Sequence, residues 1–456
     1  MIKIIVPLLV IISLLIGCND SANIEYTYFG GKIIHPKDSI LLLRSSNGFK
    51  DTLKLCSDNT FMGRYRNFKS GLYYFKHGLE YQYAYIEAKD SLIFRLNTWD
   101  FDESLVFSGR NSKINNLLIE AFLQSEEDEI MIRKECRKSS SIKFIAKMDS
   151  LLKVKKEIFE NYKQNNSTIS DGFLDVYEVA LTFPIFSGLE KYAISNCTQF
   201  KSDSAKLKFL SHRKKVQLGR DSLLFYKPYY TYVLEKMYSE AMLKGYKEDS
   251  EDFIVDIINS IDKEVSDEKI KNTILYRIIA YNFMKRTKDN NYQKAFFNYF
   301  KYSSDLEDKK EIQRLINDLK YISRNESLPN FLMEAPTGNW VNIKDIHKQE
   351  NAVICFNNEK YFSDSSVSRR FNFLKKKFPQ VNFIIIQQNK GNKDKYLKDI
   401  DIKHQYKLIE KSEAHNFLTS SFPRLMVINE KGIVLNDFSS IFAFDIEPQI
   451  QDLIKN

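Results

Sequence analysis

The spacing of the hydrophobic residues changes several times along this chain of 456 residues. From about residue 23 to residue 107, short apolar runs recur at intervals of about 8 to 12 residues, and turn residues such as Gly30-Gly31 separate them. The runs are Ile33-Ile34, Ile40–Leu43, Leu53–Leu55, Leu72–Phe75, Tyr83–Ile86 and Leu92–Phe94. Strands at this regular spacing predict a β-sandwich, or an open barrel, over residues 18–110. His35 and His77 fall at its turns, where we expect histidines exposed at the surface.

From about residue 111 to residue 325 the apolar residues recur with the period of an α-helix. One stripe runs from Ile270 to Phe283 and another from Leu306 to Ile322, and similar stripes span residues 114–132, 142–159 and 223–242. This pattern predicts an α-helical region, and no fixed period of repetition is found in it. Its aromatic clusters suit a ligand groove or a core, and their helical spacing favours a core; they are Phe225-Tyr226, Tyr229-Tyr230 and Phe296–Phe300.

In the last segment, residues 328–456, apolar strands alternate with helices. Buried strands are expected at Ala352–Phe356, Val381–Ile386, Arg424–Ile428 and Ile433–Leu435, and helices at Ser365–Phe378 and Asp445–Ile454. Such alternation predicts a partly parallel sheet that is covered on both faces. We therefore expect an α+β multidomain protein, with an N-terminal β-sandwich, a central α-helical region and a C-terminal α/β domain.

The first residues have the pattern of a signal peptide. Lys3 precedes an apolar run from Ile4 to Ile16, which is too short to cross a bilayer, since a spanning helix needs about 20 residues. Residues 1–17 are thus predicted to be a signal peptide. No other segment is expected to be long and apolar enough to cross a membrane.

Leu15-Ile16-Gly17-Cys18 resembles a bacterial lipobox. The resemblance implies that the Cys18 thiol receives a diacylglycerol and that its amine is acylated after cleavage, with palmitate among the acyl groups. Three acyl chains exceed what stable anchoring requires. The expected location is the cell envelope, with the protein anchored in the outer or inner membrane and periplasmic or exposed at the surface. The alternative is an ordinary secretory signal with a chance cysteine at its end.

Charge and composition exclude several classes of function. The chain has 68 Lys+Arg against 59 Asp+Glu, but the two signs are interleaved, so no nucleic-acid partner is predicted. Runs such as Arg213-Lys214-Lys215 and Lys375-Lys376-Lys377 are expected on solvated helix faces. With 15 Gly and no phosphate-loop motif, no nucleotide cofactor is expected, and the dispersed histidines predict no metal site.

Four stretches of the last segment resemble the thioredoxin-like domain of the TlpA/ResA type of envelope proteins. They are Leu328–Phe331, Gly338–Ile343, Ala352–Phe356 and Ser421–Gly432. The resemblance implies a thioredoxin-like fold over residues 328–456, with a cis proline at Pro423 that faces the active cysteines and pairs with the main chain of a peptide substrate. The β-rich N-terminal segment resembles an uncharacterised domain that is often fused to such lipoproteins.

The chain departs from that family at the active site. The family's C-x-x-C position falls on Tyr361-Phe362-Ser363-Asp364, and no cysteine follows Cys355. Thiol-disulfide exchange needs a reactive thiolate and a second thiol. We therefore expect a redox-inactive domain without catalytic residues, which binds or scaffolds an envelope protein or peptide through Pro423 and the Tyr361–Asp364 turn. The alternative is a thiol-disulfide oxidoreductase of envelope redox homeostasis that acts through Cys355, although this residue lies in a buried strand.

Two further features stay open at this level. Cys56, Cys136, Cys197 and Cys355 are able to pair in three ways in an oxidising compartment. Asp-Ser or Asp-Thr followed by a small or aliphatic residue resembles an O-glycosylation acceptor of some Gram-negative envelopes, but the same dipeptides are common turn and helix-cap residues, which we favour. These triplets begin at Asp20, Asp38, Asp51, Asp90, Asp149, Asp203 and Asp221.

Overall fold

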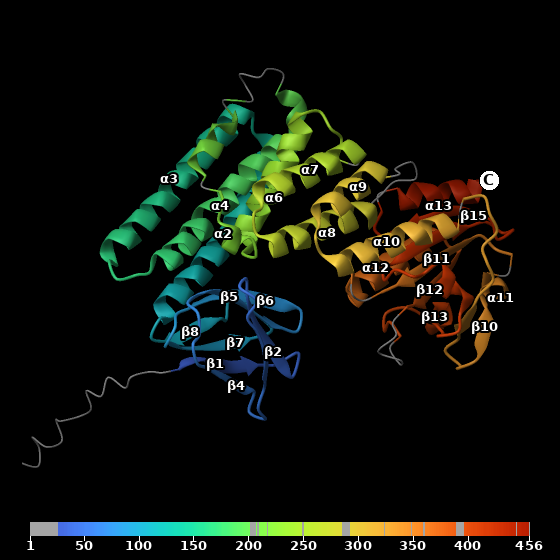
Figure 1. Ribbon diagram of the computed structural model, residues 1–456, viewed down its shortest axis with the longest axis horizontal. Helices are drawn as coiled ribbons and strands as arrows, with labels where there is room; N and C mark the ends of the chain where they lie inside the picture. Colours follow the sequence, from blue (N-terminus) through green and yellow to red (C-terminus); the bar gives the residue numbers. More distant parts are fainter. Residues whose placement is uncertain are drawn as a thin grey trace, which may run out of the picture. The chain divides into compact units, whose positions relative to one another are not determined.

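The computed structural model describes most of the chain (Figure 1). The described residues are 26–200, 207, 209–216, 218–248, 250–284, 292–322, 324–347, 349–358, 361–388, 396–443 and 445–455. The predicted signal peptide, Cys18 and the triplets at Asp20 and Asp203 lie outside them. The chain divides into two compact units, Met1–Ser239 (unit 1) and Glu240–Asn456 (unit 2). Both contain helices and sheet, so the expected mixture of helices with more than one sheet is confirmed.

The strands of unit 1 form two four-stranded sheets, in the orders β4-β1-β7-β8 and β3-β2-β5-β6. Their bounds are β1 Thr27–Ile34, β2 Ile40–Ser45, β3 Lys50–Lys54, β4 Thr60–Tyr65, β5 Gly71–His77, β6 Glu80–Ile86, β7 Ser91–Asn97 and β8 Val106–Gly109. The two sheets share one core, in which the Phe29 ring of β1 contacts Phe75 of β5 and Phe94 of β7. The sequence pattern did not reveal β4 and β8, which are short of aliphatic residues.

The expectation of a surface His77 is wrong. Its side chain is buried, the ring Nε2 accepts hydrogen bonds from the backbone amides of Lys37 and Asp38, and Nδ1 lies 3.0 Å from the carbonyl oxygen of Ile40. A buried ring that satisfies three backbone groups of the neighbouring turn is a structural element. His35, in contrast, is exposed and stacks on Trp99 with 3.7 Å between ring centroids.

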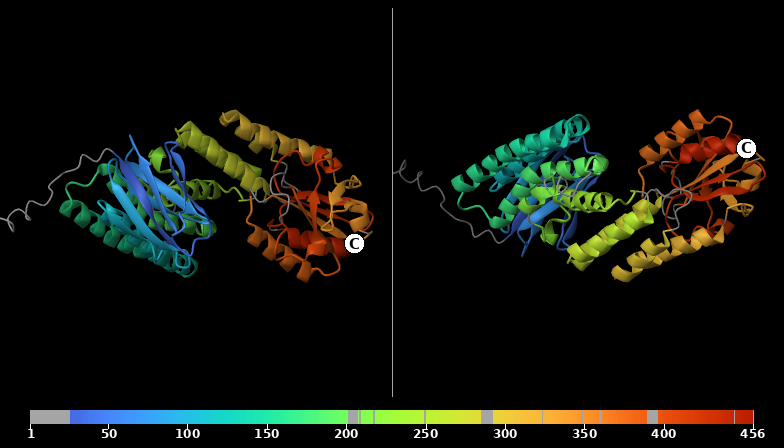
Figure 2. Two further views of the ribbon diagram at one scale, coloured as in Figure 1. Left: turned by 90° about the horizontal axis from the view of Figure 1, so that it is seen from below. Right: turned by 90° about the horizontal axis from the view of Figure 1, so that it is seen from above.

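The helices of unit 1 gather on one side of its strands (Figures 1 and 2). They are α2 Ser112–Lys138, α3 Ser141–Asn165, α4 Asp171–Ser195 and α6 Lys227–Leu243, with short 3-10 turns η1 Cys197–Gln199, η2 Leu210–Lys215 and η3 Asp221–Leu223. α4 is the central helix and packs against both α2 and α3. It is long and apolar enough to cross a membrane, which corrects the expectation that no such segment exists, but 78% of its most apolar window is buried inside the protein.

A carboxylate is buried on α4. Glu190 is fully inaccessible, and its two oxygens accept hydrogen bonds from Arg213 at 2.8 and 2.7 Å, from the Ser239 hydroxyl, and from His212, whose Nε2 lies at 2.9 Å. Arg213 therefore points into the unit and does not lie on the solvated face that its basic run suggested. Burial opposes the charge on Glu190, but the bonds from Arg213 and His212 outweigh it and lower its pKa to about 2.

Unit 2 is built on a seven-stranded sheet in the order β10-β9-β13-β12-β11-β14-β15. The strands are β9 Leu332–Glu334, β10 Trp340–Asn342, β11 Ala352–Asn357, β12 Asn382–Gln387, β13 Gln405–Leu408, β14 Arg424–Ile428 and β15 Val434–Ser439. The helices are α7 Glu251–Glu264, α8 Glu268–Met284, α9 Gln293–Tyr302, α10 Leu306–Tyr321, α11 Ile343–His347, α12 Asp364–Lys377 and α13 Ile446–Lys455, with η4 Ile402–His404 and η5 Glu413–Asn416. The strands and helices expected after residue 350 are confirmed, and β13 was missed.

The centre of this sheet has a distinctive topology. β11, α12 and β12 form a βαβ unit with parallel strands, and β14, β15 and α13 form an antiparallel ββα unit that pairs with β11. This is the arrangement of a thioredoxin-like domain. α12 and α13 cover one face, where Cys355 lies, and Phe331, Ile343 and Phe417 cover the other. Both faces are thus buried, as near-continuous apolar strands require.

The four cysteines within the described residues are all free, so none of the three possible pairings is formed. Cys56 is exposed, Cys136 and Cys197 are partly exposed, and Cys355 is buried. Three of the Asp-Ser or Asp-Thr triplets make a local hydrogen bond; those at Asp38 and Asp90 lie in the loops before β2 and β7, whereas Asp51 lies within strand β3. The carboxylates of Asp38, Asp51 and Asp90 each accept a hydrogen bond from the amide of the following residue.

Candidate functional site

The structure places Tyr361-Phe362-Ser363-Asp364 at the start of α12. Ser363 is the N-cap, and its hydroxyl accepts a hydrogen bond from the Ser366 amide at 3.4 Å. Asp364 stands in the first turn, where a negative charge is favoured by the helix dipole. The sequence therefore keeps a well-capped helix N-terminus at the position where it would stabilise the negative charge of a catalytic thiolate. The chain carries a carboxylate and a hydroxyl there instead.

Pro423 lies directly before β14 and is buried. Its neighbours meet the α12 turn, since the Tyr361 ring stacks on Phe422 with 4.8 Å between centroids, and the Tyr361 hydroxyl lies 3.3 Å from that of Ser421. Phe362 packs separately, against Phe442. The cis proline implied by the family resemblance is not found, because every peptide bond in the described part of the chain is trans. The trans form is intrinsically favoured by about 0.5–1 kcal/mol at a proline.

Cys355 lies on the sheet face that α12 covers, in the core against which Phe362 of this turn packs. It stands within β11, is 4% exposed, and packs into the apolar core with Val367 and Phe371 of α12. Burial raises the pKa of its thiol to about 12. A thiol in this environment is neutral and poorly nucleophilic, because the thiolate is the reactive form.

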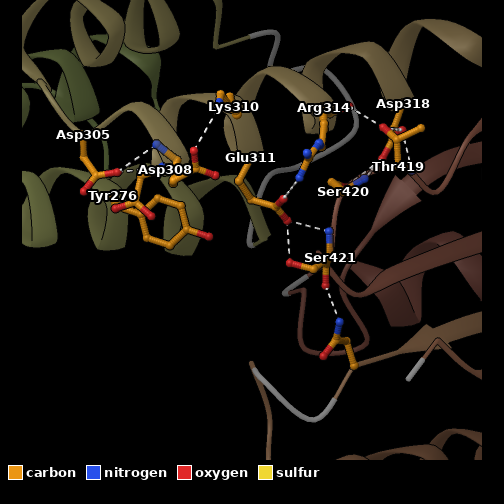
Figure 3. A network of polar contacts seen from close by, with 12 residues as sticks. Tyr276, Asp305, Asp308, Lys310, Glu311, Arg314, Asp318, Thr419, Ser420 and Ser421 are labelled. Atoms are coloured by element: carbon orange, nitrogen blue, oxygen red, sulfur yellow. Dashed lines mark hydrogen bonds and ion pairs between the residues drawn. The ribbon is translucent and has the colours of Figure 1, made fainter. Parts of the chain in front are cut away.

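The loop before Pro423 is bound by two carboxylates of α10 (Figure 3). Asp318, 2% exposed, accepts four hydrogen bonds: from the amide and hydroxyl of Thr419 at 2.9 and 2.6 Å, and from those of Ser420 at 2.9 and 2.7 Å. Glu311, two turns earlier, accepts the amide and hydroxyl of Ser421, both at 2.5 Å. We call this set of contacts the α10 clamp. It satisfies three consecutive backbone amides of the loop with side chains of the same unit.

A pair of tyrosines closes the other side of the loop. The hydroxyl of Tyr276 on α8 is 2.9 Å from that of Tyr361. The side-chain amide of Asn358 donates a hydrogen bond to the backbone carbonyl of Ser421 at 2.8 Å. Burial raises the pKa of both phenols, and the hydrogen bond shared with Tyr361 raises the pKa of Tyr276 further. Both hydroxyls therefore stay protonated at neutral pH and act as hydrogen-bonding groups.

Arg424 follows Pro423 and is 2% exposed. Its Nε donates to the Asp437 carbonyl at 2.6 Å and one terminal nitrogen donates to the Phe417 carbonyl at 2.9 Å, while the guanidinium lies over the rings of Phe417 and Phe438. The carboxylate of Asp437 in turn pairs with Arg324 at 3.0 Å. The underside of the loop is thus fixed by a buried cation, for which hydrogen bonding to carbonyls is the usual compensation.

The clamp residues were missed from sequence, although one signal was available. Glu311, Leu315, Asp318 and Ile322 follow the i, i+4, i+7, i+11 spacing of a buried helical stripe. A carboxylate in such a stripe must find donors, and the hydroxyl run Thr419-Ser420-Ser421 supplies them. The stripe does not predict which donors the helix meets, because these donors lie about a hundred residues away in the sequence.

Within the described residues no group of three or more His, Cys, Asp or Glu side chains is arranged to hold a metal ion. The contacts that the site shows are hydrogen bonds and aromatic stacking. The backbone amides and hydroxyls of Thr419, Ser420 and Ser421 are all engaged by side chains of unit 2.

Comparison with known proteins gives structural neighbours alone, since no protein-family model and no curated protein matches the chain. A thioredoxin-like protein from Bacteroides caccae is 13% identical, with a TM-score of 0.29, and the match covers 58% of this chain and 93% of that one. A thiol:disulfide interchange protein from Bacteroides sp. is also 13% identical, with a TM-score of 0.25, over 30% of this chain and 92% of that one.

An exposed lipoprotein thioredoxin from Streptococcus pneumoniae is 15% identical, with a TM-score of 0.21, over 28% of this chain and all of that one. The neighbours are thus thioredoxin-like proteins of the thiol-disulfide exchange type that match part of the chain. The thioredoxin-like character of unit 2 rests on its own strand order, described above.

Proposed function

We propose that this protein is a membrane-anchored lipoprotein of the cell envelope, whose thioredoxin-like domain does not exchange thiols and serves as a scaffold. The observation that carries this proposal is the α10 clamp. Thioredoxin-like proteins use the loop before the conserved proline to pair with the main chain of a substrate. Here the amides of Thr419, Ser420 and Ser421 are bonded to Asp318 and Glu311. The former substrate surface thereby joins helix α10 to the sheet.

The absence of a suitable thiol supports the same proposal. Cys355 is the only cysteine after residue 240, and its side chain is buried in the core. A mixed disulfide needs a second thiol for its resolution, and unit 2 has none. The rival function, an oxidoreductase acting through Cys355, would require β11 to open.

The surface of unit 1 suits a position next to a membrane. Thr27, the first residue of β1, follows Cys18 by nine positions, a distance of at most about 30 Å along an extended chain. The solvent-facing strand positions of the sheet β4-β1-β7-β8 carry Lys32, Arg64 and Arg95. Basic side chains near an anionic headgroup layer each add to binding, at about 1 kcal/mol.

The thiol of Cys355 is expected to resist modification in the folded protein. At a pKa of about 12, on the order of one thiol in 10⁵ is ionised at pH 7, against about 3% at an ordinary pKa of about 8.5. Iodoacetamide at neutral pH should modify the exposed Cys56 readily and leave Cys355 unmodified until the protein is unfolded in urea, as measured by peptide mass spectrometry. The native protein should also fail to accelerate the reduction of insulin by dithiothreitol.

Cys56 serves as the internal control, because its label shows that reagent and conditions are adequate. Rapid alkylation of Cys355, together with insulin reduction that disappears in Cys355→Ala, would establish the oxidoreductase and refute the scaffold.

Lipid attachment is expected to depend on Cys18 alone. Expressed in a Gram-negative host, the protein should incorporate labelled palmitate and sediment with membranes, and Cys18→Ser should lose both properties. Cys56→Ser, which removes an exposed thiol elsewhere, should retain them. If Cys18→Ser still carries label and stays in the membrane fraction, the lipobox interpretation is wrong.

The proposed partner of the scaffold is an envelope protein or peptide. Such a partner has to contact other surfaces than the amides of Thr419–Ser421, or it has to displace the carboxylates of α10. Crosslinking in intact cells followed by mass spectrometry identifies it, and repeated recovery of no specific protein would count against the scaffold role.

A further inference from the structure

A cavity of about 300 Å³ lies in unit 1, outside the site described above. Its walls come from β6, α2, α4 and the start of α6 (Figure 1 shows these elements together). This volume is at the lower end of what small-molecule sites in proteins occupy. The predicted aromatic cluster Phe225-Tyr226 contributes one residue, Tyr226, to the wall.

The buried end of the cavity carries a hydroxyl without a hydrogen-bond partner and a helix carbonyl that lacks its usual helical donor. The Ser187 side chain, in a residue that is 3% exposed, has no hydrogen-bond partner for its hydroxyl among the described residues. Three residues earlier, Pro184 has no amide N–H, so it cannot make the helical hydrogen bond to the carbonyl of Ala180. Both Ala180 and Pro184 line the cavity. A buried hydroxyl without a partner is costly unless a ligand or water completes it.

The rim of the cavity is acidic. Four carboxylates line it, those of Glu80, Asp102, Glu126 and Glu129, against one cationic side chain, Lys227. Glu80, Glu126 and Glu129 are exposed, and Glu126 and Glu129 have no ion-pair partner within the described part of the chain. Burial raises the pKa of Asp102, and the negative charges of Glu126 and Glu80 act on it in the same direction. A cation placed between these groups would relieve their repulsion.

Aromatic rings connect the acidic rim to the polar floor. Tyr81, Tyr83, Phe122 and Tyr226 all line the cavity, and the rings of Tyr83 and Tyr226 meet edge to face at 4.8 Å. The Tyr83 hydroxyl is fixed, since it donates to the Phe225 carbonyl at 2.9 Å. Aromatic walls accept methylene groups, and their faces attract cations.

From the carboxylate rim, the aromatic walls and the unsatisfied Ser187 hydroxyl, we infer that this cavity binds a short linear aliphatic diamine. One ammonium lies between the rim carboxylates, the carbon chain packs on the tyrosine and phenylalanine rings, and the second ammonium donates to the Ser187 hydroxyl and the Ala180 carbonyl. This inference does not depend on the lipid anchor or on the lack of thiol exchange.

The test is calorimetric titration of the full chain with the series from 1,3-diaminopropane to 1,6-diaminohexane. At least one diamine should bind with one-to-one stoichiometry and a Kd on the order of 0.1 mM. The diol of the same length should not bind measurably, because it lacks the charge that the rim selects. Failure of every diamine to bind, or equal binding of diamine and diol, overturns the inference.

Two variants with a matched control locate the site. Glu126→Gln/Glu129→Gln on α2 should weaken binding about tenfold or more, since it removes two exposed charges from the rim. Glu157→Gln/Glu160→Gln, an exposed pair with the same spacing on α3, should leave the Kd unchanged. Ser187→Ala should weaken binding several-fold through the floor. Equal loss in the rim and control variants would indicate non-specific charge attraction and would refute the site.

Discussion

Asp318→Asn is expected to destabilise unit 2 by about 3 kcal/mol. The amide that replaces one carboxylate oxygen of Asp318 turns an NH2 group toward the backbone N–H of Thr419 or Ser420, so that backbone amide loses its acceptor in a buried position, and the neighbouring hydroxyl has to turn from donor to acceptor. Removing one partner from such a buried contact costs more than the contact contributes, because the remaining groups stay without water. Urea denaturation followed by circular dichroism measures the effect.

Hydrogen exchange gives a local measurement for the same variant. The backbone amide that faces the new NH2 group, that of Thr419 or that of Ser420, should exchange about 100-fold faster in Asp318→Asn, because it loses its acceptor. Glu307→Gln is the matched control on α10, because Glu307 is exposed and forms an ion pair with Lys310, one turn away on the same helix. It should change stability by less than about 0.5 kcal/mol. Unchanged protection of Thr419 and Ser420 in Asp318→Asn would show that the α10 clamp does not hold the loop.

Glu190→Gln is expected to be comparably disruptive in unit 1 and to alter its response to acid. Because the pKa of Glu190 is lowered from 4.5 to about 2 in the folded state, its carboxylate stabilises the fold above pH 4.5. This contribution is lost as the pH falls from 4.5 toward 2, and it amounts to about 3 kcal/mol. Removing the charge leaves Arg213 and His212 facing a neutral amide inside the protein.

The experiment is a set of urea titrations between pH 7 and pH 3. The wild-type protein should lose stability more steeply below pH 4.5 than Glu190→Gln does, and at pH 7 the variant should be less stable by about 3 kcal/mol. Glu157→Gln, an exposed carboxylate on α3, should follow the wild type throughout. Parallel curves for Glu190→Gln and the wild type would mean that the buried carboxylate is not ionised in the folded protein.

Helix α4 and strand β4 lack the hydrophobic periodicity from which the other elements were predicted. α4 was not recognised because it is buried on nearly all sides and so has no polar face to create a period. β4 was missed because Met62 and Arg64 alternate with Phe61 and Gly63 without an aliphatic run. In contrast, β11, β12 and β14 are apolar at nearly every position, since both faces of this mixed sheet are covered, and this signal is local.

The candidate site shows the same division. The sequence alone determined that a helix begins at Tyr361–Asp364 and that no thiol stands there, because both properties depend on adjacent residues. Tertiary structure decided which side chains bind the loop before Pro423. Asp318 and Glu311 lie about a hundred residues from Thr419–Ser421 and meet them only when α10 packs beside the sheet. Hydrogen bonds between distant segments depend on how these segments pack, and this packing is not encoded in the hydrophobic periodicity of either segment. The sequence therefore determined that no cysteine stands at the start of α12, and the fold decided that carboxylates of the chain's own helix α10 bind the loop.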